Sequence, residues 1–449
     1  CAWFDEFATS DVDKRMVADA AIFKKQHSRF VSQRTKKLLS QKVINRLGDL
    51  AIVETDSETS TINSLSSVIF ENTLKLHQRH QVSDGKRNVS IGLVRMANIN
   101  PLVEVAKALL KLDAPEDTCI HYCVYHSRYP LAIRSHIEQK LDKILKRKDS
   151  DSLWQADSEV GRVFGDLPEK NHVFVVLASP VAEVGRDHDY DWAIAEPSSM
   201  RSIIQLAGRL LRHRTEAQPT TPNIVLLNKN LKALKGNKIC FEKPGFEMEN
   251  IKLSSHDLKE CLHESQYSKI TATPRITLPD AKDYTPTDKN EYVNLSALEH
   301  KALAWQLFTG DKHAKIWWDK QPYWCGEVQR QQRFRQSNND EAYYLYVDDE
   351  YKTPYWCWLN EESYPPKLGE PSSISISTQK SLMHGNNSHF WFDLSPLAIY
   401  SELADAFGFD LTEVSRNFGE LRVTEYEKND RDEYVYHDNL GLYQELDNQ

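Results

Sequence analysis

Residues 178–214 (ASPVAEVGRDHDYDWAIAEPSSMRSIIQLAGRLLRHR) combine arginines, acidic residues and glycines in the pattern of a phosphate-binding site. The apolar run HVFVVLASP that leads into them is typical of a buried parallel strand that ends in a loop. Gln205, Gly208, Arg209 and Arg212 follow at i, i+3, i+4 and i+7, so helical spacing places them on one face. Guanidinium groups bind phosphate oxygens as planar forks, and glycine lets the backbone approach a ligand closely. The spacing therefore predicts a triphosphate-binding helix face.

The loop ahead of this helix is acidic, with Glu183, Gly185, Asp187, Asp189 and Asp191 in nine residues. An ordinary amphipathic surface helix with solvated arginines would show the same RxxR spacing. The strand and the acidic glycine loop before it favour the phosphate site.

These two segments resemble motifs V and VI of superfamily 2 helicases, with SPVAEVGRD as the fifth and QLAGRLLRHR as the sixth. EVGRDHDYD followed by QLAGRLLRHR is similar to the helicase-nuclease that CRISPR type I systems recruit. Upstream, GLVRMANINPLVEVAKALL and HYCVYHSRYPLAIRSHIEQKLDKIL resemble its type I-F branch. The resemblance covers residues 89–214 well, and CAWFDEF and YHDNLGLY resemble shorter parts of the same branch.

The resemblance implies part of an ATP-dependent DNA helicase-nuclease that unwinds and degrades foreign DNA in CRISPR type I-F interference. It implies ATP with Mg as the cofactor. On this chain it implies two catalytic arginines, Arg209 and Arg212, and four further nucleotide-binding residues, Gln205, Gly208, Gly185 and Asp187. Arg212 would be the finger on the γ-phosphate, Arg209 the second phosphate contact, and Gln205 would orient them.

Four polar residues that follow predicted strands are implied to bind DNA: Ser179, His126, Ser127 and Arg128. For the last three, a polar cap at a strand end stays open as the alternative. The implied partners are single-stranded DNA and the CRISPR RNA-guided surveillance complex, with the adaptation integrase and phage anti-CRISPR proteins as further candidates.

A complete motor also needs a P-loop and a DExH box, and neither pattern occurs in the sequence. Gly85-Lys86 and Gly310–Lys312 lack the P-loop spacing, and Asp5-Glu6 only mimics a DExH box. Three His-Asp pairs are candidate metal ligands, but none has a second cluster of ligands nearby: His188-Asp189, His256-Asp257 and His437-Asp438. We therefore expect no metal site here and assign the nuclease metal to another domain.

The chain begins with Cys1 inside a family-like segment, so we expect it to be the C-terminal portion of a longer polypeptide and inactive alone. The alternative is a catalytically incomplete module that binds nucleic acid or a partner and regulates the CRISPR complex.

Strand and helix patterns alternate from residue 88 onward, which predicts an α/β fold: a RecA-like parallel sheet with flanking helices, then a linker and a smaller C-terminal accessory domain. The predicted parts are a helical lead-in (1–87), the second RecA-like domain (88–235), an irregular linker (236–335) and the accessory domain (336–449). The aromatic residues of the last part, such as Tyr343 and Trp356, fit either a small core or a base-stacking surface.

Composition agrees with a multi-domain protein of the cytoplasm. No run approaches the roughly 18 apolar residues of a membrane span, and seven cysteines without a signal peptide are read as reduced thiols. Cys119, His121 and Cys123 alternate along one predicted strand and are interpreted as strand interior. Residues 1–235 carry a net charge of +5 and the rest −14, which makes the first half the better candidate for phosphate contact.

Overall fold

The computed structural model describes most of the chain, in the ranges 20–40, 45–55, 60–147, 153–155, 158–165, 167–183, 185–214, 216–242, 244–309, 340–350, 352–360, 367–369, 374–424 and 433–446. Cys1, Asp5-Glu6 and Gly310–Lys312, on which sequence-based expectations rested, lie outside these ranges. Among the described residues, no helix combines the length and the apolar character needed to cross a membrane.

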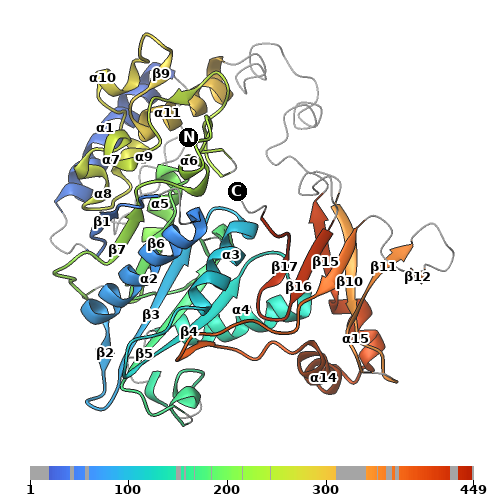
Figure 1. Cartoon of the computed structure of the whole chain (residues 1–449). Coiled ribbons are helices and arrows are strands. Elements are labelled where there is room, and N and C mark those ends of the chain that lie inside the picture. Colours follow the sequence, from blue (N-terminus) through green and yellow to red (C-terminus); the bar gives the residue numbers. More distant parts are fainter. Residues whose placement is uncertain are drawn as a thin grey trace.

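A parallel sheet forms the centre of the molecule (Figure 1). Its strands are, in spatial order, β1 (Gly48–Ala51), β7 (Ile224–Leu227), β6 (Trp192–Ala195), β3 (Asn88–Arg95), β5 (Asn171–Ala178), β4 (Thr118–Tyr125) and β14 (Ser388–Phe390). Every neighbouring pair along this path is parallel, and only the short β2 (Val82–Ser83) pairs with β3 antiparallel. The predicted α/β fold with a parallel sheet is confirmed.

Helices cover both faces of this sheet because its central strands are apolar on both sides. Along β5, Val173, Val175 and Leu177 join one hydrophobic cluster, and the residues between them join the other. Helices α2 (Thr61–His80) and α3 (Ile99–Leu110) pack in the first cluster, and α4 (Leu131–Leu145) and α5 (Met200–Ala207) pack in the second. The α5 helix, which holds the start of the arginine motif, therefore rests on one face of the sheet.

The two edges of the sheet come from outside the predicted RecA-like segment. Strand β1 lies within the predicted helical lead-in and pairs with β7, and β14 lies within the predicted accessory domain and pairs with β4. The sequence boundaries at residues 88 and 336 thus do not coincide with the limits of the sheet.

The predicted linker is folded over residues 244–309. Its elements are β8 (Lys252–Leu253), α7 (Leu258–Cys261), α8 (Glu264–Tyr267), α9 (Thr273–Ile276), α10 (Ala281–Tyr284), β9 (Glu291–Tyr292) and α11 (Leu295–Ala304). In Figure 1 they gather with α1 (Ala20–Leu39) at one end of the sheet, beside α5 and the short α6 (Leu231–Leu234). Leu295, Leu298 and Ala302 of α11 are buried in the same cluster as α5, so this region and the motif helix share a core.

The C-terminal region forms smaller sheets at the opposite side (Figure 1). An antiparallel sheet has the order β12 (Lys367–Gly369), β11 (Tyr355–Asn360), β10 (Asp340–Tyr346) and β15 (Glu420–Thr424), and a second has the order β13 (Ser375–Thr378), β16 (Glu433–His437) and β17 (Gly441–Tyr443). Helices α14 (Pro396–Phe407) and α15 (Leu411–Phe418) pack together below them.

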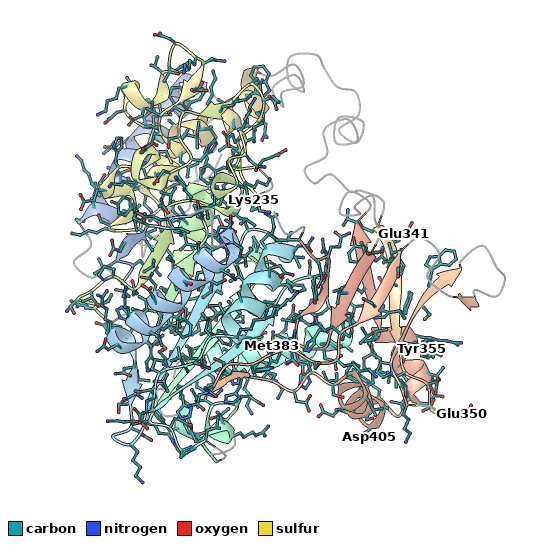
Figure 2. All side chains as sticks on the ribbon, in the orientation of Figure 1. Lys235, Glu341, Glu350, Tyr355, Met383 and Asp405 are labelled. Carbon is teal, nitrogen blue, oxygen red and sulfur yellow. The ribbon has the colours of Figure 1, made fainter. Side chains whose placement is uncertain are left out.

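Aromatic side chains of this region are divided between interior and surface. Tyr343 is fully buried, whereas Tyr355 is 44% exposed. Figure 2 places Glu350 and Tyr355 on the side of the region away from the central sheet, and Asp405 at its lower edge. The burial of Tyr343 shows that this side chain belongs to the small core and is not part of a base-stacking surface.

Candidate nucleotide site

The arginine motif begins on α5 but leaves the helix before its first arginine. The Ser199 hydroxyl caps the helix by accepting from the Ser202 amide at 3.0 Å, and the helix ends at Ala207 with Gly208 as its C-cap. Leu210 then forms a parallel bridge with Tyr190, and Leu211 has a φ of 47°. The pairing with the acidic loop ends the helix, so the prediction that one helical face carries both arginines is wrong.

Arg209 and Gln205 still meet at one point, the backbone of the acidic loop. The Arg209 guanidinium donates to the Glu183 carbonyl oxygen at 2.5 Å, and the Gln205 amide donates to the same oxygen at 3.0 Å. Arg209 is 9% exposed. Both side chains therefore fix the position of the loop.

The Glu183 side chain is held on the opposite side by a buried ion pair. Its carboxylate lies 2.9 Å from Arg95 Nε and accepts from the Ser202 hydroxyl at 3.1 Å. Burial raises the pKa of Glu183, although Arg95 and Ser202 oppose the shift. Glu183 thereby connects strand β3, helix α5 and the loop that follows β5.

Arg212 is the arginine that reaches the surface. Its Nε donates to Asp187 Oδ1 at 2.5 Å, and their side chains are 43% and 51% exposed. The hydrogen bond from Arg212 lowers the pKa of Asp187, and a further bond from His213 contributes. Gly185 has a φ of 69° with open space where a side chain would stand. Gly185, Asp187 and Arg212 thus form an accessible polar surface, which we call the Arg212 surface.

Arg214 is a further arginine of the motif that the sequence analysis did not assign. It bonds Asp189 at 2.7 Å and Asp191 at 2.6 Å, and Arg147 bonds Asp191 at 2.6 Å as well. Burial alone would raise the pKa of Asp191, but the two guanidinium groups hold it below its ordinary value. The alternation of Asp187, Asp189 and Asp191 in the loop was the available signal for this second set of pairs.

The candidate metal pairs have other partners. His188 is buried and lies 2.9 Å from Asp142 and 3.1 Å from the Tyr190 hydroxyl, and burial lowers its pKa to about 4. His256 lies 2.8 Å from Glu247. Within the described part of the chain, no three potential ligands are grouped for a metal ion.

The predicted DNA-binding residues at the end of β4 support the C-terminal segment instead. His126 is fully buried, and its Nε2 lies 2.8 Å from the Leu440 carbonyl oxygen. Arg128 is 5% exposed, bonds Asn100 at 2.8 Å, and its carbonyl accepts from the Leu442 amide at 2.9 Å. A direct contact between DNA and either side chain would require this segment to leave. The alternative from the sequence analysis, a polar cap at the end of a strand, describes His126 and Arg128 better than DNA binding does.

The two serines differ in access. Ser179 directly follows β5 and is 6% exposed, whereas Ser127 is exposed at the surface. Of the four residues predicted to bind DNA, Ser127 alone has an exposed side chain.

Comparison with known proteins identifies the family. Residues 88–215 match the family described as CRISPR-associated nuclease/helicase Cas3, C-terminal. The Cas3 nuclease/helicase of subtype I-F/YPEST from Pectobacterium atrosepticum is 41% identical over 99% of this chain, and its counterpart from Pseudomonas aeruginosa is 35% identical over 98%. The chain belongs to the Cas3 family of subtype I-F. It spans 40% of the length of each of these two relatives.

Solved structures give a weaker likeness. Cas3 of T. fusca with ATP is 14% identical, with a TM-score of 0.37 over 90% of this chain and 41% of that chain. A chain of a CRISPR RNA-guided surveillance complex in a pre-nicking state is 16% identical, with a TM-score of 0.26 over 42% of this chain and 19% of that chain.

Proposed function

We propose that this chain supplies the arginine half of the ATP site in an ATP-dependent DNA helicase-nuclease that unwinds and degrades foreign DNA in CRISPR type I-F interference. The observation that carries the proposal is the Arg212 surface. It combines an exposed guanidinium, whose partner Asp187 is itself half exposed, with a glycine that leaves room for a ligand. The kinship with nuclease/helicases of this subtype supports the same function.

The arginines have different roles in this proposal. Arg212 is the finger that binds the γ-phosphate when another domain brings ATP to this face. Arg209 and Gln205 position the loop by holding the Glu183 carbonyl, so that Gly185 and Asp187 face the nucleotide. Gly208 is the C-cap of α5 and stands directly before Arg209.

The exposed guanidinium and the open space beside Gly185 fit an anionic triphosphate. ATP supplies the γ-phosphoryl group whose hydrolysis drives movement along DNA. Mg accompanies ATP in this proposal, and its protein ligands are proposed to lie on other domains of the whole protein.

Single-stranded DNA and the RNA-guided surveillance complex are the partners proposed for the whole protein. On this chain, Ser127 is the DNA contact that its exposure favours. Ser179 would donate to a DNA phosphate only after a movement of the loop that follows β5.

Arg212→Ala tests the proposal in a polypeptide of the relatives' full length. We expect ATP turnover to fall roughly 10³-fold or more, as for the loss of an arginine finger, while metal-dependent nicking of single strands persists. Arg186→Ala is the matched control, because Arg186 lies in the same loop but pairs with Glu138 and Asp142. Turnover that survives Arg212→Ala would overturn the proposal.

A further inference from the structure

Helix α5 is held at both ends by charged side chains that lie outside the predicted RecA-like segment. At its start, the Glu299 carboxylate accepts from the amides of Met200 and, at 3.3 Å, Arg201. At its end, Arg46 Nε donates to the Ala207 carbonyl oxygen at 2.7 Å. Glu299 is 99 residues from Met200 in sequence, and Arg46 is 161 residues from Ala207.

The signs of these charges match the electrostatics of the helix. The first amides of a helix carry partial positive charge and its last carbonyls partial negative charge, so the acceptor oxygens of Glu299 at the start and the cation of Arg46 at the end are both favourable. Burial raises the pKa of Glu299 to about 7 and outweighs the bonds from the Met200 and Arg201 amides, which lower it. With the Ser199 hydroxyl on the Ser202 amide, the first three amides of α5 all have partners. A helix of eight residues is too short to be stable by itself, so its position depends on such contacts.

Both residues are fixed by their own surroundings. Glu299 is 6% exposed on α11, whose Leu295 and Leu298 are buried in the core shared with α5. The carbonyl oxygen of Arg46 accepts from the Ile270 amide at 3.1 Å. These anchors tie the folded region 244–309 to the motif helix.

The opposite side of α5 leads directly to the acidic loop. Ser202 bonds the Glu183 carboxylate, and the Glu183 carbonyl accepts from Gln205 and Arg209. A shift of α5 along its axis would therefore move the loop that carries Asp187, and with it the guanidinium of Arg212.

We infer that Glu299 and Arg46 are positioning residues that hold α5, and through it Arg212, in register for phosphate binding. This inference rests on the proposed function of Arg212. It assigns a role in the motor to the region 244–309, which the sequence presented as a linker. Neither side chain contacts the nucleotide itself.

Hydrogen exchange on the 449-residue chain tests the structural part. We expect Glu299→Gln, which keeps one acceptor oxygen, to speed exchange of the Met200 and Arg201 amides about tenfold, and Glu299→Ala to speed it further. Glu247→Gln is the matched control: Glu247 is also buried, but the backbone amides that it accepts are those of Cys240, Phe241 and Leu253 rather than those of α5. Equal protection of α5 in the Glu299 and Glu247 variants would overturn the inference.

ATP kinetics in a polypeptide of the relatives' full length test the functional part. We expect kcat to fall at least tenfold in Glu299→Ala and less in Glu299→Gln, with the KM for ATP changed less than threefold, because a misplaced finger lowers only transition-state binding. Arg46→Met should behave like Glu299→Ala. Arg87→Met is its control, because Arg87 donates to the Phe164 carbonyl far from α5.

Two outcomes separate this inference from the proposal beneath it. If Arg212→Ala abolishes turnover but the Glu299 variants match Glu247→Gln, the positioning role is wrong and the finger stands. If Arg212→Ala leaves turnover intact, the proposed function is wrong, and the positioning role falls with it.

Discussion

Replacing Gly441 by alanine is expected to loosen the C-terminal segment far more than the same replacement at Gly408. Both glycines have a φ of 69°, so an alanine at either position bears the same left-handed strain of roughly 1–2 kcal/mol. A Cβ at Gly408 would meet nothing within 4 Å, whereas at Gly441 it would lie 2.7 Å from the Arg128 carbonyl oxygen and 2.7 Å from His126 Cε1. The pair of variants therefore separates backbone strain from packing.

The packing part can be given a magnitude. Forcing an extra methyl into a filled interior costs about 1–3 kcal/mol. One of the two close atoms is a backbone oxygen that itself accepts from the Leu442 amide, so relief requires the segment to move away and lose that bond. We expect Gly441→Ala to destabilise the C-terminal segment by about 2 kcal/mol more than Gly408→Ala destabilises the end of α14, which corresponds to a roughly 30-fold larger change in the local opening equilibrium.

Amide hydrogen exchange measures this opening locally, without requiring two-state unfolding of a large chain. The Leu442 amide, bonded to Arg128, reports on Gly441→Ala, and the Phe409 amide, bonded to Ala404, reports on Gly408→Ala. Amides of β5 serve as the internal reference. The reasoning would be refuted if Leu442 exchanged at the same rate in both variants, because the C-terminal segment would then not be packed against residues 126–129.

Other predictions concern charge. Arg214→Ala should destabilise the chain by about 3–5 kcal/mol, because it leaves buried carboxylates such as Asp191 with one partner fewer. Arg212→Ala should destabilise it by at most about 1 kcal/mol, because the ion pair of Arg212 is exposed. Chemical denaturation of the two variants compares these losses. Burial raises the pKa of Glu299 from 4.5 to about 7. The contribution of this carboxyl to the free energy of unfolding is therefore fully present below pH 4.5 and is lost as the pH rises through 7, a change on the order of 3 kcal/mol. Denaturation of Glu299→Gln as a function of pH should not show this loss. Arg128→Ala should lower stability and leave the salt slope of single-strand binding unchanged, since the side chain is buried; a flatter slope in a salt titration would restore the predicted phosphate contact.

The central strands were predictable because each carries a strong local signal. TCIHYCVY is β4 in full, and VFVVLAS covers most of β5. The edge strands were not: β1 has four residues and β14 three, and neither run shows a period that distinguishes it from loop. Their place is decided by pairing with distant strands, which a single sequence does not reveal.

The candidate site was predicted in its residue types but not in its local geometry. The loop and the arginines do meet, as Asp187 and Arg212 show. The helix was extended too far, because its end is determined by the bridge between Tyr190 and Leu210 rather than by a breaker in the motif. The anchor Glu299 lies in a segment whose sequence gave no reason to connect it with α5.

The same geometry decides which arginine can change partners during a nucleotide cycle. Arg214 bonds carboxylates that are 0% and 2% exposed, so withdrawing it would leave buried charge without compensation, which costs several kcal/mol. Arg212 bonds a carboxylate that is 51% exposed, and water can take the place of either partner at a cost of about 1 kcal/mol or less. A phosphate group can therefore displace Asp187 from Arg212 while Arg209 and Arg214 keep the loop in place. For this reason we propose Arg212 for the phosphate contact, and we expect Asp187 to hold its guanidinium in place until the nucleotide binds.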